Sequence, residues 1–267
     1  MNETMGNLGF TRSLHDPCLY YKPHQGLYVF VCVDDCNIFG KKNSIIDFKK
    51  EIGKVYTIKD IGTASNILSV NISGDLTTTM LDQTKYIENM LLVFRLSGAK
   101  GVDIPLPSST KTYRDSDNPF QPTLYRRATG SLLHIANNTR PDIAFSMSHL
   151  CRKNEFPIKK DWVDVKHLWR YLQQTKDVKM IYQVDNLRLD EILVYVDSDW
   201  AGDKSDRKST TGFVILLAGA PISWKSRKQR SLTLSTVEAE YMALSEVVRE
   251  EVWLTYLLEE LRFEKNR

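Results

Sequence analysis

The sequence has little of what marks a membrane, secreted or disulfide-bonded protein. It contains no stretch of about 18 uninterrupted apolar residues, and its N-terminus, MNETMGNLGF, lacks the apolar segment of a secretory signal. Only four cysteines are present, at positions 18, 32, 36 and 151, without the paired spacing of a zinc site or a disulfide scaffold. We therefore expect reduced core thiols in a soluble intracellular protein, cytoplasmic or nuclear, that is neither secreted nor bound to a membrane.

Strong charge of one sign is also missing, since 36 Lys and Arg residues face 33 Asp and Glu residues, a net charge of +3. Distribution matters more than this total. Basic residues gather in 206–210 and 224–231, whereas 236–251 is acidic. A basic loop followed by an acidic helix is compatible with phosphate binding beside metal binding.

The 267 residues, 42% of them hydrophobic, are enough for two or three compact cores. Hydrophobic periodicity predicts a strand, a turn and a strand in residues 26–40, and a strand at 192–199 followed by two more. A loop rich in Pro, Ser, Thr and Asp, 104–122, is a plausible boundary. The segments with helical spacing are 45–56, 83–98, 123–140, 141–153, 161–177 and 235–263.

Two adjacent carboxylates, Asp34 and Asp35, stand between apolar strand-forming runs in VFVCVDDCNIFG. A hairpin turn explains such a pair most simply, because Asp accepts hydrogen bonds from its own backbone and tolerates turn dihedrals. A metal site is the alternative, and spacing alone does not decide between them.

A second group of carboxylates lies in the C-terminal third of the sequence, around the basic runs and in the acidic helix. Asp197 and Asp199 are two apart in a predicted strand and so share a face. At about 100° per residue, Glu240 falls within an apolar stripe of the last helix, as does Glu251 three turns on. A buried carboxylate is costly unless it is paired or binds metal, so one interpretation is that Glu240 and Asp197 converge on a divalent ion, provided that the helix packs over the strand. The alternative is a strand that simply ends in the polar turn SDWAGDKSD.

Several stretches together resemble one family along nearly the whole chain. They are NLGFTRSLHDPCLYYK, VCVDDCNIFG, LDQTKYIENML, YRRATGSLLHIANNTRPDIAFSMSHLCR, DSDWAGDKSDRKSTTGF, SWKSRKQ and LSTVEAEYMAL. In order and spacing they resemble the C-terminal part of the Pol polyprotein of copia-type LTR retrotransposons. The similarity covers the end of the reverse transcriptase and most of the RNase H domain.

The resemblance implies roles for the four carboxylates. Asp34 and Asp35 match the palm hairpin that carries two metal-binding carboxylates of the polymerase, with Asp34 the stronger catalytic candidate. Asp197 matches the first carboxylate of RNase H, and Glu240 the second. The implied cofactor is Mg²⁺ or Mn²⁺, because hard cations prefer carboxylate oxygens.

It also implies the fold class and three domains. The expected fold is α+β, with a reverse-transcriptase palm remnant and a helical thumb or connection, followed by an incomplete RNase H-like α/β domain. The palm hairpin and primer grip are placed in 1–80, the thumb or connection in 81–186, and the RNase H-like part in 187–267.

The expected partners are RNA–DNA hybrid, an RNA template and DNA, with other Pol segments as further candidates. Phosphate contacts are assigned to the two basic runs near the C-terminus, where a solvated charged face is the simpler alternative. The residues are Arg207, Lys208, Lys225, Arg227 and Lys228.

The chain also departs from the family pattern. The third polymerase carboxylate is expected before residue 1, and a further RNase H Asp is expected beyond Arg267. Cys32 replaces the usual Tyr before VDD, and Ser69 replaces a Gly of the primer-gripping hairpin. We therefore hypothesise that the isolated chain is inactive, or that it is a noncatalytic nucleic-acid-binding remnant or an inert relic.

Overall fold

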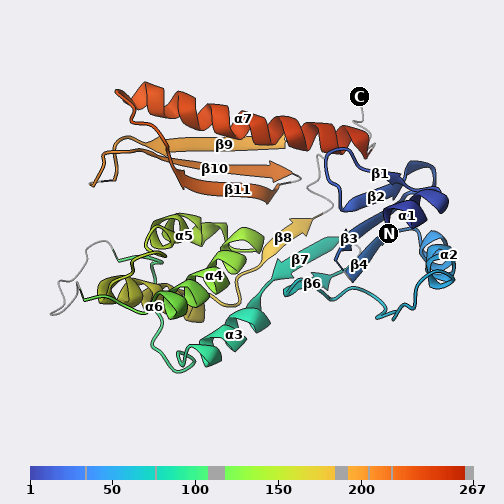
Figure 1. Cartoon of the computed structure of the whole chain (residues 1–267), viewed down its shortest axis with the longest axis horizontal. Helices are drawn as coiled ribbons and strands as arrows, with labels where there is room; N and C mark the ends of the chain where they lie inside the picture. The colour runs from blue at the N-terminus through green and yellow to red at the C-terminus, as the bar shows by residue number, and fades with distance from the viewer. Residues whose placement is uncertain are drawn as a thin grey trace. The chain divides into compact units, whose positions relative to one another are not determined.

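A computed structural model describes residues 1–33, 35–75, 77–107, 118–183, 192–203, 205–217 and 219–261. Helices and antiparallel sheets are mixed along the chain, which confirms the α+β class (Figure 1). The chain divides into two units, residues 1–64 with 248–267 and residues 65–247. The predicted boundaries near 80 and 186 fall inside the second unit, so the three-domain division stays a prediction.

The first unit is built on a four-stranded antiparallel sheet with the order β1-β2-β3-β4. Its core joins this sheet to two helices through Met5, Phe10, Leu27, Val29 and Phe48. The elements are α1 (Asn2–Asn7), β1 (Thr11–Arg12), β2 (Leu19–Lys22), the 3-10 turn η1 (Pro23–Gln25), β3 (Leu27–Cys32), β4 (Asp35–Gly40) and α2 (Lys42–Gly53).

The second unit contains a four-stranded sheet and a helical core around the fully buried Trp169. Tyr125 donates its hydroxyl to the Leu150 carbonyl at 3.0 Å and so ties α4 to α5. The elements are β5 (Asn66–Ile67), β6 (Val70–Gly74), β7 (Thr78–Asp82), α3 (Thr84–Val93), α4 (Pro122–Asn138), the 3-10 turn η2 (Pro141–Ile143), α5 (Ala144–Cys151), α6 (Lys159–Gln174) and β8 (Met180–Gln183).

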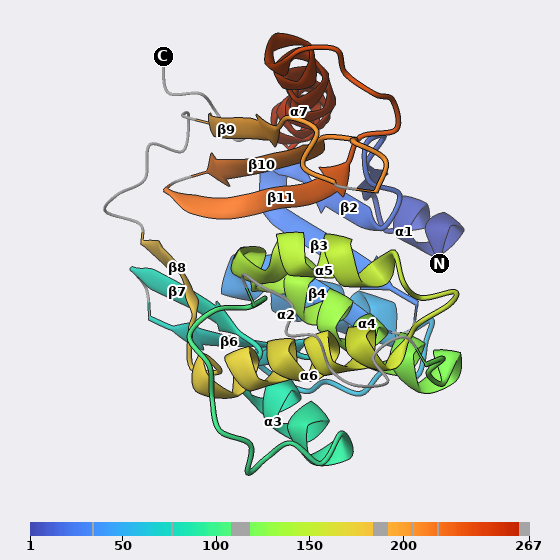
Figure 2. The same cartoon turned by 90° about the vertical axis from the view of Figure 1, so that its left-hand side faces the viewer.

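The same unit holds a three-stranded antiparallel sheet in the order β11-β10-β9. Its strands are β9 (Ile192–Asp199), β10 (Thr210–Leu217) and β11 (Ala220–Lys228), as the alternation of residues predicts. Helix α7 (Thr236–Glu260) follows, and its first half belongs to this unit. The first half of α7 covers one face of the sheet and α5 lies against the other (Figure 2).

Helix α7 begins as the sequence predicts but turns a different face inward. Ser235 accepts a hydrogen bond from the Glu238 amide at 3.1 Å, and the Glu238 carboxylate accepts from the Leu234 amide at 2.6 Å. The buried positions of the first half are Ala239, Ala243 and Val247, whereas Glu240 is exposed. The prediction that Glu240 lies on the inner face is therefore wrong.

The cause is that α7 carries apolar residues on both sides. The predicted stripe runs through Val237, Ala243, Leu244 and Val247; Ala243 and Val247 are buried, but Val237 and Leu244 are exposed. Successive residues are about 100° apart around a helix. A stripe that is centred slightly wrongly therefore places an exposed residue such as Glu240 on the predicted buried face.

The β5–β6 hairpin explains why glycine is expected at position 69. Ile67 pairs with Val70, so the loop is the two residues Leu68 and Ser69, with φ angles of 49° and 67°. Two successive positive φ angles match a type I′ turn, whose positions favour Gly and Asn.

Replacing Ser69 with glycine should raise the free energy of unfolding by about 1 kcal/mol. A non-glycine residue in the left-handed region costs roughly 1–2 kcal/mol, which the glycine variant avoids. The unfolded chain has more conformational entropy with glycine, and this reduces the gain in stability. Urea denaturation measures the change. Ser73→Gly, in strand β6 without positive φ, is the control and should lower stability by about 0.5–1 kcal/mol. Equal changes for both variants would contradict the turn assignment.

Candidate functional site

The VDD hairpin has the strand, turn and strand that the sequence predicts. Cys32 at the end of β3 pairs with Asp35 at the start of β4. Val33 is 94% exposed with a φ of 56°, an unusual conformation for a β-branched residue. Asp35 is exposed at the first position of β4. Asp34, the stronger catalytic candidate, lies outside the described residues.

Cys36, the residue after Asp35, is affected by the charge of this hairpin. Partial desolvation of the sulfur and, after it, the negative charge of Asp35 raise the pKa of the Cys36 thiol, although the residue as a whole is exposed. All four cysteines are free: Cys18 and Cys36 are exposed, Cys32 is half-buried, and Cys151 is half-buried and packs against the helical core. The prediction of core thiols is therefore wrong for Cys18 and Cys36.

Strand alternation places Asp197 on one definite face of the three-stranded sheet. Asp197 is opposite Gly212, which is opposite Ser226, and directly opposed residues point to the same side. On that side Trp224 donates its indole N–H to the Ala136 carbonyl of α4 at 2.7 Å. Asp197 therefore points toward the side on which the sheet meets the helical core.

Helix α7 lies on the opposite face. Lys225 and Arg227, the two neighbours of Ser226, point the other way and pair with Glu246 of α7 at 2.8 and 3.9 Å. Asp197 and Glu240 are thus separated by the sheet, and Glu240 is exposed on the helix. The predicted convergence of these two carboxylates is not seen.

No group of three or more His, Cys, Asp or Glu side chains in the described ranges could hold a metal ion. Asp35 stands alone at its hairpin within the described residues, and Asp197 and Glu240 lie on different faces. The described residues do not fit the Mg²⁺ or Mn²⁺ site that the resemblance implies.

Asp199 and Asp203 organise the loop after β9. Asp199 accepts a hydrogen bond from the Thr210 amide, and its carboxylate occupies the space that a side chain at Gly202 would need. Asp203 accepts from Lys228 at 2.6 Å and from Arg152 at 3.0 Å. Hydrogen bonds from Lys228, and then Ser205, hold the pKa of Asp203 well below its usual value. These carboxylates have structural roles.

The five predicted phosphate contacts fall into two groups. Lys225 and Arg227 are paired with Glu246, and Lys228 is paired with Asp203 and Asp206. Arg207 is exposed and Lys208 half-buried, and neither forms an ion pair within the described part of the chain. Only the second group keeps its charge free for a ligand.

Sequence inspection missed a buried arginine in the NTRPD motif. The side chain of Arg140 is 2% exposed and forms a double hydrogen bond with Asp142, at 2.9 and 2.7 Å. It also donates to the carbonyl and the hydroxyl of Thr175, at 2.9 and 2.7 Å. Tyr171 donates to Asp142 at 2.8 Å. An Arg two residues before an Asp, with Pro between them, was the available signal.

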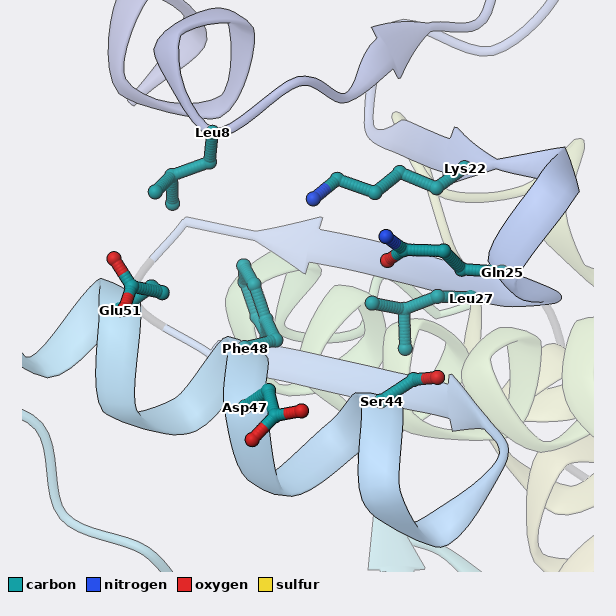
Figure 3. A pocket seen from close by; sticks show the side chains of 8 residues that line it. All are labelled: Leu8, Lys22, Gln25, Leu27, Ser44, Asp47, Phe48 and Glu51. Atoms are coloured by element: carbon teal, nitrogen blue, oxygen red, sulfur yellow. The ribbon is translucent and has the colours of Figure 1, made fainter.

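The described part of the structure contains a groove in the second unit and a smaller pocket in the first unit. A groove of about 820 Å³ lies on the Asp197 side of the sheet, lined by η2, α5 and the three strands. A smaller pocket of about 300 Å³ lies in the first unit between Lys22 and helix α2, with Leu27 and Phe48 as its apolar floor (Figure 3). Lys22 points into this pocket, and its amine lies 4.5 Å from the centre of the Phe10 ring. Asp35 lines neither cavity.

None of the helices in the described ranges is long and apolar enough to cross a membrane.

Comparison with known proteins shows which protein family the chain is similar to. Residues 1–108 match the family model for reverse transcriptase (RNA-dependent DNA polymerase). The chain is 36% identical over 266 residues to the retrovirus-related Pol polyprotein from transposon TNT 1-94 of Nicotiana tabacum, covering 94% of this chain and 20% of that protein. No solved structure matches.

Two shorter relatives are covered almost completely. An uncharacterized mitochondrial protein of Arabidopsis thaliana is 31% identical over 85% of this chain and 94% of its own length. A protein ascribed to transposon Ty5-1 in Saccharomyces cerevisiae is 30% identical over 94% of this chain and 82% of its own length. The chain therefore belongs to the family of retrovirus-related Pol polyproteins of copia-type transposons, as a segment that contains part of the reverse transcriptase. It spans about one fifth of the length of the tobacco polyprotein.

Proposed function

We propose that this chain is a segment of reverse transcriptase and RNase H that binds RNA–DNA hybrid and does not catalyse polymerisation or cleavage alone. The observation that carries the proposal is the separation of Asp197 from Glu240 by the three-stranded sheet. Two-metal hydrolysis needs carboxylates that converge on the same ions, and two on opposite faces of a sheet cannot do so.

The finer domain assignment is part of the same proposal. Residues 1–80 would correspond to the palm hairpin and primer grip, 81–186 to the thumb or connection, and 187–267 to an RNase H-like domain. The type I′ turn at Ser69 and the three antiparallel strands followed by α7 support it. Reverse transcriptases use divalent metal ions, and in this proposal Asp34, Asp35, Asp197 and Glu240 would contribute only together with other Pol segments.

Hybrid binding would depend on the unpaired cations of the loop before β10. Arg207→Ala and Lys208→Ala should each reduce the slope of log K against log salt concentration by about 1, because each phosphate contact releases counterions. Fluorescence anisotropy of a labelled RNA–DNA hybrid between about 50 and 200 mM salt measures the slope.

The matched control is Lys225→Ala. Its amine is held by Glu246 at 2.8 Å, so the slope should stay unchanged. Asp197→Asn should also retain hybrid binding. A slope that falls for Lys225→Ala and not for Arg207→Ala would overturn the assignment, and binding that is absent at the lower salt concentration would overturn hybrid binding itself.

A further inference from the structure

The groove on the Asp197 side of the sheet has aromatic walls. Phe145 of α5 and Tyr195 of β9 line it and are 52% and 58% exposed. Trp224 of β11 lines it as well and is fixed by its hydrogen bond to the Ala136 carbonyl. The groove volume of about 820 Å³ lies in the range of sites for small ligands.

The groove also carries negative charge that no cation neutralises. Within the described ranges, the Asp197 carboxylate has no hydrogen-bond or ion-pair partner, and the Asp199 carboxylate has only the Thr210 amide. Asp142 lines the groove but is neutralised by Arg140. Lys225 lines it too, yet its amine is bound to Glu246 on the other face.

Gly212 leaves room directly beside the Asp197 carboxylate. A Cβ built at Gly212 would have its nearest neighbour, the Asp197 carbonyl, at 3.9 Å. Gly212 does not have the positive φ that requires glycine. The space next to the charge is thus open, and a side chain could fill it without straining the strand.

We propose that this groove binds a small organic cation, an ammonium group carried on an apolar body. Aromatic faces attract a diffuse cation, and the Asp197 carboxylate supplies the opposite charge. A hard ion such as Mg²⁺ requires several oxygen ligands in close geometry, which the described residues do not gather here. This ligand class goes beyond hybrid binding and does not depend on it.

The test compares choline with 3,3-dimethyl-1-butanol, which has the same shape without the charge, by isothermal titration calorimetry on the full chain. Choline should bind about tenfold more tightly than the neutral alcohol, the size expected for one desolvated cation on aromatic rings and a carboxylate. Asp197→Asn should remove most of this preference, and Tyr195→Leu should weaken choline binding. Glu240→Gln, on the far face, should change neither.

Gly212→Ala tests the shape of the groove. It should fold normally, as judged by circular dichroism, and weaken the binding of both probes, because its methyl group narrows the space beside Asp197. Equal affinities for choline and the alcohol would overturn the proposal, as would displacement of choline by stoichiometric Mg²⁺. Hybrid binding is measured separately by anisotropy. A failure of cation binding can therefore be told apart from a failure of hybrid binding.

Discussion

Replacing Arg140 with methionine should lower the free energy of unfolding by about 3 kcal/mol. The variant keeps a long apolar side chain but removes the four hydrogen bonds that Arg140 donates to the Asp142 carboxylate and to the carbonyl and hydroxyl of Thr175. Breaking a buried ion pair by removing one partner costs roughly 3–5 kcal/mol, and the lower end applies because the Asp142 side chain is 36% exposed. Urea denaturation at neutral pH measures the loss.

The deficit should depend on pH in a definite direction. Burial opposes the charged form of Asp142, but hydrogen bonds from Arg140 and Tyr171 outweigh it, so the pKa lies below its usual value. A lowered pKa in the folded state stabilises the protein above about pH 4, and the contribution is lost as the pH falls through the folded-state pKa. The gap between the native chain and Arg140→Met should therefore narrow in acid.

Arg140→Lys is the matched control. It keeps the charge but loses the planar fork that reaches Asp142 and Thr175 at once, so it should lie between the native chain and Arg140→Met. If Arg140→Met unfolds at the same urea concentration as the native chain, the ion pair does not stabilise the fold.

Replacing Ala243 with aspartate should lower the free energy of unfolding by about 3 kcal/mol or more. Ala243 is fully buried between Ala239 and Val247 on the face of α7 that meets the sheet. A carboxylate there would be desolvated without a partner, which is among the most destabilising single changes. Thermal and urea unfolding of the purified variant measure the loss.

Two variants at exposed positions of the same helix serve as controls. Ser245→Asp and Glu240→Leu change exposed positions and should alter stability by no more than about 0.5 kcal/mol. If Ser245→Asp were as damaging as Ala243→Asp, burial of the Ala243 face would not be the cause of the loss.

Much of the fold could be predicted because its signals are local. The VDD hairpin, the strands of residues 192–228 and the N-terminal cap of α7 follow from alternation, turn residues and a capping box. The helix that contains Trp169 was also predicted, since its apolar residues follow a single stripe. Each of these signals lies within one short segment of chain.

The candidate site was less predictable because it depends on which faces of the strands and helices pack against one another. Asp197 was placed correctly in a strand, but the side it points to is fixed by the partners of β11, which the strand alone does not show. Glu240 lies beside the apolar Val237 and Leu244 on the helix surface, which predicts an inward position, although both of these residues are exposed. The spacing of Arg140 and Asp142 is a local signal, but the second partner of Arg140, Thr175, is 35 residues away, and the sequence does not show that the two meet.

The ion pairs of the basic strand show the same limit. Lys225, Arg227 and Lys228 form a basic run in the sequence, yet alternation sends the first two to Glu246 and the third to Asp203. A run of charges therefore predicted phosphate contacts at positions whose charge is already neutralised.

The most direct test of the central claim is a cleavage assay of the purified chain on a labelled RNA–DNA hybrid with Mg²⁺ or Mn²⁺. If Asp197 and Glu240 cannot share metal ions, cleavage should not exceed that of the Asp197→Asn and Glu240→Gln variants. Cleavage by the native chain that both substitutions abolish would contradict the account, because it would require the two carboxylates to act on one site.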